Sequence, residues 1–261
     1  MVNKNDIPIL NFDTDKNAKL TNKQLEGYEN LGIKYGVICF ETAPMEDMVL
    51  AYPSRIIGVV KKAGLPRLNI YAVKFNGTEI VLHPGVVGAP LAACFMENLV
   101  SFGCKNVIAM GCAGVLNQKI ARGHLIIPNS AVRQEGTSYH YIEPSRYIEY
   151  SPKIINKMTS YLTKKKIPFV CGRTWTTDGL FRETKDLIAL RKKEGCVCVE
   201  MENSALGAVA QFYGIKFGQI LYGADCLEGA CWALRKWESD EIKQKSTFEI
   251  LKLAMELVTK I

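Results

Sequence analysis

Acidic side chains gather in the last third of the sequence, where they could act as catalytic acids or hydrogen-bond acceptors. Glu200 and Glu202 flank Met201, directly after a short apolar run and at the start of a helix expected over residues 202–212. Asp225 closely follows a second apolar run. One ionised carboxylate can accept hydrogen bonds from a pair of sugar hydroxyls, and an acid at a strand end can act on a leaving group. On position alone, these carboxylates are equally suited to capping helices.

Two segments of small residues are suited to anion binding. Gly85–Pro90 stands immediately before an expected helix, and the expected turn Gly111–Gly114 follows an apolar strand. Glycine lets backbone N–H groups approach an anion, and a helix N-terminus attracts negative charge. The functional interpretation is a phosphate cradle that includes Gly88, Gly111 and Cys112. The structural alternative is a pair of turns that only connect elements.

The elements that would position these residues alternate between strands and helices. Asn76-Gly77 predicts a tight hairpin because both residues tolerate positive φ. Pro90 suits the first turn of a helix that ends at Gly103, and a closing amphipathic helix is expected over residues 240–260. Strands are expected over residues 35–40, 70–75, 79–83, 107–110, 125–128, 169–176, 196–199 and 217–222.

This alternation predicts an α/β fold with a mixed, largely parallel twisted sheet flanked by helices. We expect one domain over residues 35–261, preceded by an N-terminal extension over residues 1–34. In such sheets ligands bind where the strands reach their carboxyl ends. The acidic and the glycine-containing segments all lie at such ends.

Composition narrows the class of protein. The chain has 261 residues, 48% of them hydrophobic, with no apolar run long enough to span a membrane and no secretory signal, so we expect a cytosolic protein. Nine scattered cysteines and three histidines show no metal-ligand spacing, and we expect neither a metal nor disulfides. The net charge of +7 comes from dispersed lysines and arginines, which does not favour nucleic-acid binding.

Four motifs in order along the chain resemble those of the nucleoside phosphorylase family, which includes uridine phosphorylase, hexameric purine nucleoside phosphorylase and methylthioadenosine nucleosidase. Two linked motifs lie in GCAGVLNQKIARGHLIIPNSAVRQEGTSYHY (111–141), one in TTDGLF (176–181) and one in VEMENSALGAVAQFYGI (199–215). The resemblance runs from about residue 35 to the C-terminus. It implies the fold of that family and an enzyme of nucleoside metabolism that cleaves an N-glycosidic bond.

The resemblance also implies roles for the acidic residues. Glu202 would accept hydrogen bonds from the ribose hydroxyls, with Met201 packed against the sugar and Glu200 in contact with the base. Asp225 stands where purine-cleaving members keep an aspartate that protonates or hydrogen-bonds purine N7. Bond cleavage leaves negative charge on the base, which an acid beside the base stabilises.

The segment before the acidic motif implies how the base is bound. Leu180, Phe181 and Arg182 belong to the loop that lines the base in this family. Uridine phosphorylases use a glutamine and an arginine of this loop for the uracil edge, and their GQER-like signature is absent here, since residues 181–184 read FRET. Purine nucleosides are therefore favoured over uridine.

The phosphate site departs from the family pattern. The usual arginine-bearing loop after the first strand is replaced by the acidic segment Glu41–Asp47, and Ala109 and Cys112 stand where an arginine and a Thr or Ser are usual. Arg67 matches a third arginine, which a neighbouring subunit donates. Arg133, Arg182 and Arg235 are candidates to replace the missing pair.

Three functions remain open. The leading hypothesis is a nucleoside phosphorylase that uses inorganic phosphate as co-substrate, needs no organic cofactor and forms a homo-oligomer, a dimer or a hexamer, because Arg67 would act in trans. The first alternative is a nucleosidase that uses water, which the acidic segment around Met45 favours. The second is a non-catalytic relative that binds a nucleoside.

Overall fold

The computed structural model describes residues 2–21, 27–61, 64–229 and 231–261. The main sheet has ten strands: β3 (Tyr35–Cys39), β4 (Ser54–Val60), β5 (Leu68–Phe75), β6 (Thr78–Pro84), β7 (Asn106–Val115), β8 (Leu125–Gln134), β9 (Tyr147–Glu149), β10 (Phe169–Thr177), β11 (Cys196–Glu200) and β12 (Lys216–Cys226). The helices are α1 (Thr42–Ala51), α2 (Ala89–Ser101), α3 (Pro152–Lys164), α4 (Lys185–Lys193), α5 (Asn203–Tyr213) and α6 (Asp240–Val258).

The sheet is mixed and partly closed on itself. Its order is β11-β10-β8-β12-β7-β3-β6-β5-β4, with β9 beside β8. β3 pairs in parallel with β6 and β7, and β7 pairs in parallel with β12. β8 turns antiparallel to β12, and the end of β7 pairs antiparallel with β11. Strands β7, β12, β8, β10 and β11 therefore form a closed ring, a feature that the sequence did not predict.

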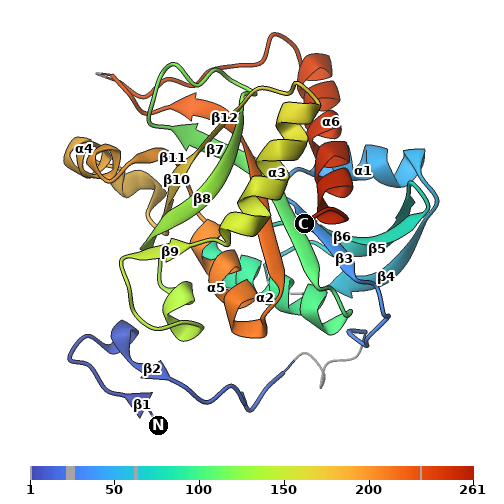
Figure 1. The fold of residues 1–261 in the computed structure, drawn as a ribbon, viewed down its shortest axis with the longest axis horizontal. Helices are drawn as coiled ribbons and strands as arrows, with labels where there is room; N and C mark the ends of the chain where they lie inside the picture. Colours follow the sequence, from blue (N-terminus) through green and yellow to red (C-terminus); the bar gives the residue numbers. More distant parts are fainter. Residues whose placement is uncertain (1, 22–26, 62–63, 230) are drawn as a thin grey trace.

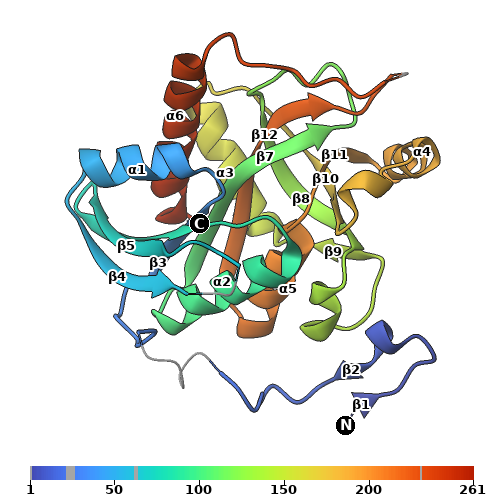
Figure 2. The ribbon, with the colours of Figure 1, turned by 180° about the vertical axis from the view of Figure 1, so that it is seen from behind.

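Helices cover both faces of the sheet. α3 and α6 lie on one face together with α1, and their apolar residues form one core with the central strands (Figure 1). α2 and α5 pack side by side on the opposite face, where a second core contains Phe95, Leu99 and Leu206 (Figure 2). The chain is thus a single α/β domain with a mixed sheet between helical layers, as predicted.

Local sequence signals placed several elements correctly. Asn76 and Gly77 form the two-residue turn between β5 and β6, with φ of 48° and 80°. α2 begins after Gly88 with Pro90 in its first turn, and α6 covers most of the predicted closing helix. These predictions are confirmed because turn and cap residues act through their own backbone geometry.

The predicted turn Gly111–Gly114 is wrong. These residues continue β7, where Gly111 pairs with Leu221 of β12 and Gly114 pairs with Val199 of β11. A side chain at Gly111 would come within 3.2 Å of Phe40 Cβ. The glycines therefore allow close packing between strands, and a loop that cradles phosphate is not present at this position.

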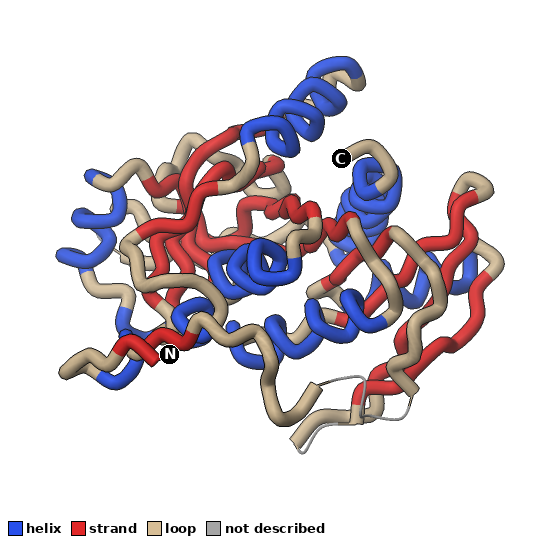
Figure 3. Tube along the Cα trace, turned by 60° about the horizontal axis from the view of Figure 1, so that its bottom comes forward, coloured by secondary structure: helices blue, strands red, loops and turns tan. Residues whose placement is uncertain are grey.

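The N-terminal segment lies outside the main sheet (Figure 3). It contains the ribbon β1 (Val2–Asn3) and β2 (Phe12–Asp13) and the short helix η1 (Pro8–Leu10). The ribbon and η1 contact the short helix η3 (Thr137–His140), and Lys16 Nζ donates to Phe212 O at 3.2 Å. No helix among the described residues is long and apolar enough to cross a membrane.

Candidate active site

Glu200, at the end of β11, anchors the start of α5. Its side chain is buried and accepts hydrogen bonds from Thr176 Oγ1 at 2.6 Å and from the backbone N–H groups of Glu202 and Asn203 at 2.7 and 2.5 Å. Burial and the nearby charge of Glu202 raise the pKa of Glu200. Both oxygens of its carboxylate are already bound by protein donors. The predicted contact between Glu200 and the base is therefore not what the structure favours, and Glu200 positions Glu202 instead.

Glu202 lies between β11 and α5 with half-buried Met201 beside it. Its Oε1 accepts a hydrogen bond from Gly88 N at 2.6 Å. Burial raises the pKa of Glu202 to about 7, although the Gly88 N–H bond acts in the opposite direction. Gly88 has a φ of 111°, which favours glycine. Its N–H, predicted to bind phosphate, is thus committed to holding the carboxylate of Glu202.

Asp225, near the end of β12, is held by the segment that follows it. Its Oδ2 accepts a hydrogen bond from Trp232 Nε1 at 2.6 Å. The guanidinium of Arg235 donates to the backbone carbonyls of Ile120 at 2.6 Å and Ala224 at 3.0 Å, which ties this segment to the strand. Trp232 thus orients the carboxylate of Asp225.

Cys112 marks the place where the carboxylates converge. Part of the Cys112 residue is exposed to solvent on β7, while its thiol lies among neighbouring protein atoms. Burial, followed by the negative charges of Glu41, Asp225 and Glu202, raises the pKa of the Cys112 thiol to about 11. The carboxylates come from three separate elements at the ends of β3, β11 and β12. Their charges therefore act on one common space beside Cys112.

Glu41 is a member of this group that sequence analysis treated only as part of an acidic segment. It precedes α1, so the segment expected to replace the phosphate loop is mostly helix. The hydroxyl of Tyr222, whose ring is buried in β12, donates to Glu41 Oε1. No local sequence signal links residues so far apart in the chain.

The loop predicted to line the base forms the short helix η4 (Leu180–Arg182). Leu180 and Phe181 are 53% and 94% exposed, and Arg182 is exposed as well. Glu183 instead turns inward, where burial and the charge of Asp225 raise its pKa to about 7. Glu183 is therefore a further acid near Asp225, and no motif in the sequence marks it, because its inward orientation depends on the fold of this loop.

The arginines considered for phosphate do not gather around Cys112. Arg67 is exposed just before β5. Arg133 donates to Ser138 Oγ at 2.9 Å and to Glu143 O at 2.7 Å, and Arg235 is bound to backbone carbonyls. Arg122 is the positive side chain whose charge acts on the Cys112 thiol, with a smaller effect than that of the carboxylates. The described residues hold no group of three or more side chains suited to a metal ion.

Comparison with known proteins agrees with this architecture. The profile of the Phosphorylase superfamily matches residues 57–258, and the chain belongs to this superfamily. The DeoD-type purine nucleoside phosphorylase of Brevibacillus brevis is 24% identical over 188 residues, covering 70% of this chain and 76% of that protein.

Solved structures show the same fold. Uridine phosphorylase from Vibrio fischeri is 22% identical and superposes with a TM-score of 0.71, covering 93% of this chain and 95% of that one. The methylthioadenosine/S-adenosylhomocysteine nucleosidase of Campylobacter jejuni is 15% identical with a TM-score of 0.71, covering 88% and 100%. The fold is thus shared by proteins named as phosphorylases and as nucleosidases.

Proposed function

We propose that this protein cleaves the N-glycosidic bond of a nucleoside, with purine nucleosides as the favoured substrates. The observation that carries the proposal is that β7 pairs, around Cys112, with both β11 and β12, the strands whose ends lead to Glu202 and Asp225. An acceptor for the sugar and an acid for the base thus face one space. A nucleoside placed there has its glycosidic bond between them.

Each carboxylate has a separate task in this reaction. Glu202, fixed by Gly88, accepts hydrogen bonds from the ribose hydroxyls. Asp225 acts on the leaving base through Oδ1, because Oδ2 is bound by Trp232. As the bond breaks, positive charge builds on the sugar and negative charge on the base. The surrounding carboxylates stabilise the first, and a proton that Glu183 holds beside Asp225 neutralises the second.

Water is the nucleophile that the electrostatics favour. The carboxylates around Cys112 repel a phosphate dianion, since two like charges 5 Å apart cost about 3 kcal/mol at an effective dielectric constant of 20. Arg133 and Arg235 are engaged elsewhere. Glu41, held by the Tyr222 hydroxyl, is placed to accept a proton from an attacking water. This moves the preference away from the phosphorylase that the sequence favoured.

Phosphorolysis is the second candidate, because relatives of this chain are named as phosphorylases. It requires inorganic phosphate as co-substrate and a homo-oligomer in which Arg67 of one subunit completes the anion site of another. Gel filtration and the Arg67→Gln variant test this arrangement. A monomer with full activity, or an Arg67→Gln variant with unchanged phosphate dependence, would exclude it.

Base release from inosine, adenosine, guanosine and uridine, with and without inorganic phosphate, tests the proposal. We expect release from the purine nucleosides without phosphate, with ribose as the sugar product. Ribose 1-phosphate formed strictly with phosphate would replace water by phosphate as the nucleophile. Binding of nucleosides without turnover of any would refute cleavage and identify a nucleoside-binding protein.

A further inference from the structure

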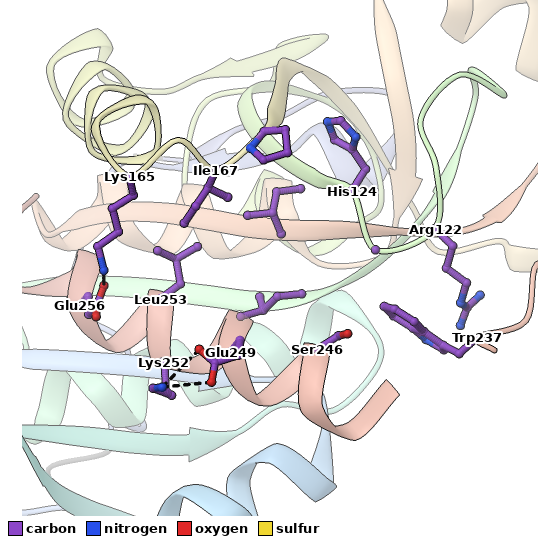
Figure 4. Close-up of a pocket in the computed structure, with 14 residues that line it drawn as sticks. Arg122, His124, Lys165, Ile167, Trp237, Ser246, Glu249, Lys252, Leu253 and Glu256 are labelled. Carbon is purple, nitrogen blue, oxygen red and sulfur yellow. Dashed lines mark hydrogen bonds and ion pairs between the residues drawn. The ribbon is translucent and has the colours of Figure 1, made fainter. Parts of the chain in front are cut away.

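A cavity lies on the face of the sheet that carries α3 and α6. Its volume is about 580 Å³, and it is bordered by the loop Arg122–Leu125, the connection between α3 and β10, and one side of α6 (Figure 4). Its apolar lining includes Ile167, Ile250 and Leu253. Arg122, whose charge also acts on the Cys112 thiol, lies on the border between this cavity and the nucleoside site. A cavity of this size accommodates a small organic molecule.

Three of the residues that line this cavity each carry a side-chain nitrogen atom that is buried without a hydrogen-bond partner among the described residues. They are Arg122 Nε, His124 Nε2 and Trp237 Nε1. The described part of the chain contains five such buried atoms in all, so most of them gather here. An unpaired buried polar group costs about 1–3 kcal/mol, and such groups normally have a partner. Their gathering in one cavity indicates a missing acceptor.

Arg122 has no ion-pair partner among the charged residues that line the cavity. At one end Lys165 forms an ion pair with Glu256, and Lys252 forms one with Glu249 at 3.0 Å (Figure 4). Arg122 instead donates to the backbone carbonyl of Arg235, and no carboxylate in the described chain forms an ion pair with it. The end of the cavity beside Arg122 therefore carries net positive charge.

The backbone conformation at Gly123 allows Trp237 to pack against the loop at the Arg122 end of the cavity. Gly123 has a φ of 78°, and a Cβ there would lie 2.8 Å from Cη2 of Trp237. The guanidinium of Arg122 lies over the Trp237 ring, 5.3 Å from its centroid. A glycine between Arg122 and His124 thus lets the indole of Trp237 pack against the loop that borders the cavity.

We propose that this cavity is a binding site for a small organic anion with an aromatic or aliphatic body and one carboxylate or phosphate group. The anionic group accepts hydrogen bonds from Arg122, His124 and Trp237, which pairs the orphan nitrogen atoms and the charge of Arg122 at once. The body of the ligand packs on Ile167 and Leu253. The cavity borders the nucleoside site, because the charge of Arg122 also acts on the Cys112 thiol, but anion binding here does not require the nucleoside reaction.

The tryptophan indole N–H groups offer a direct test by ¹⁵N–¹H correlation spectroscopy. The chain has three tryptophans, and the variants Trp237→Phe and Trp232→Phe assign their signals. Trp237 reports on the cavity, while Trp232, bonded to Asp225, reports on the nucleoside site. The probes are benzoate, phenyl phosphate and inorganic phosphate, with benzyl alcohol as the neutral analogue of benzoate.

We expect benzoate or phenyl phosphate to shift the Trp237 signal saturably, and the stronger of the two identifies the preferred anionic group. Benzyl alcohol should bind at least tenfold more weakly, and inorganic phosphate, which lacks the apolar body, should also bind more weakly. Arg122→Gln should weaken binding of the organic anion at least tenfold. Arg146→Gln, which removes an exposed arginine paired with Glu194, is the matched control and should change nothing.

Several outcomes overturn the proposal. They are shifts of the Trp232 signal alone, equal binding of benzyl alcohol and benzoate, or unchanged binding in Arg122→Gln. If Arg122→Gln does not fold, Ser246→Phe fills the cavity from α6 and should abolish the Trp237 shift. Persistence of the shift in that variant, or only ordered water in the cavity of crystals soaked with the probes, also overturns it.

Discussion

Replacing Glu202 by glutamine should remove most of the activity and at the same time stabilise the folded chain at pH 8. The glutamine carbonyl can still accept the hydrogen bond from Gly88 N, so the local geometry is retained. The buried negative charge is lost. Activity and stability should therefore change in opposite directions, which loss of a merely structural residue would not produce.

The magnitudes follow from the burial of Glu202. Burial raises the pKa of Glu202 from 4.5 to about 7. Between pH 4.5 and pH 7, Glu202 therefore keeps its proton in the folded chain and has lost it in the unfolded chain. Stability therefore falls as pH rises through this window, and ionisation costs at most about 3 kcal/mol at pH 8. Glu202→Gln should recover much of this, raising Tm by several degrees at pH 8 and by little at pH 5. In Glu202→Gln the two proposed hydrogen bonds from the ribose hydroxyls are accepted by a neutral amide instead of a carboxylate. We expect this change to lower kcat/KM by roughly 100-fold.

Thermal unfolding at pH 5 and pH 8, together with steady-state base release, measures both effects. Glu79→Gln is the matched control because Glu79 is exposed and paired with Arg55 on the surface, so neither quantity should change appreciably. A Glu202→Gln variant that keeps activity within threefold of the wild type would refute the ribose role. A lower Tm at pH 8 would refute the reasoning from burial.

Three further substitutions test neighbouring contacts. Trp232→Phe removes the N–H donor to Asp225 and should lower kcat about tenfold, a change of about 1.4 kcal/mol in steady-state kinetics; an unchanged kcat contradicts the orienting role. Tyr222→Phe removes the hydrogen bond to Glu41 and should slow hydrolysis about tenfold, while the nucleoside affinity measured by calorimetry stays unchanged. An equal loss of affinity contradicts this role. Gly123→Ala should cost about 2 kcal/mol in urea unfolding, since its φ is positive and the added Cβ meets an indole; a cost below about 0.5 kcal/mol would be inconsistent with that packing.

Features set by neighbouring residues could be read from the sequence, and features set by distant pairing could not. Asn76-Gly77 specifies its turn through its own backbone preferences. Gly111–Gly114 has the same turn-like composition but is held as strand by β11 and β12, which lie about 85 and 110 residues further along the chain. Small residues thus have different meanings in a turn and in a crowded sheet.

The candidate site likewise contains residues that a local motif identifies and contacts that only the fold reveals. The resemblance of residues 199–215 located Glu202, but the contact between Tyr222 and Glu41 joins residues 181 positions apart and has no local signal. Glu200 matched the motif for base contact, yet its carboxylate bonds to the N-terminus of α5. A motif identifies which residues share a site, and packing decides which of them face the ligand.

The position of β12 has a consequence for how the chain acquires its structure. This strand lies between β7 and β8 at the centre of the sheet, although it is the last strand in the chain. During synthesis β7 and β8 therefore expose unpaired edges until residues near Cys226 have left the ribosome. Such non-local pairing slows folding and prolongs the exposure of aggregation-prone strands. Completion of the core, and with it assembly of the acidic site, is expected to be a late step that follows release of the C-terminal part of the chain.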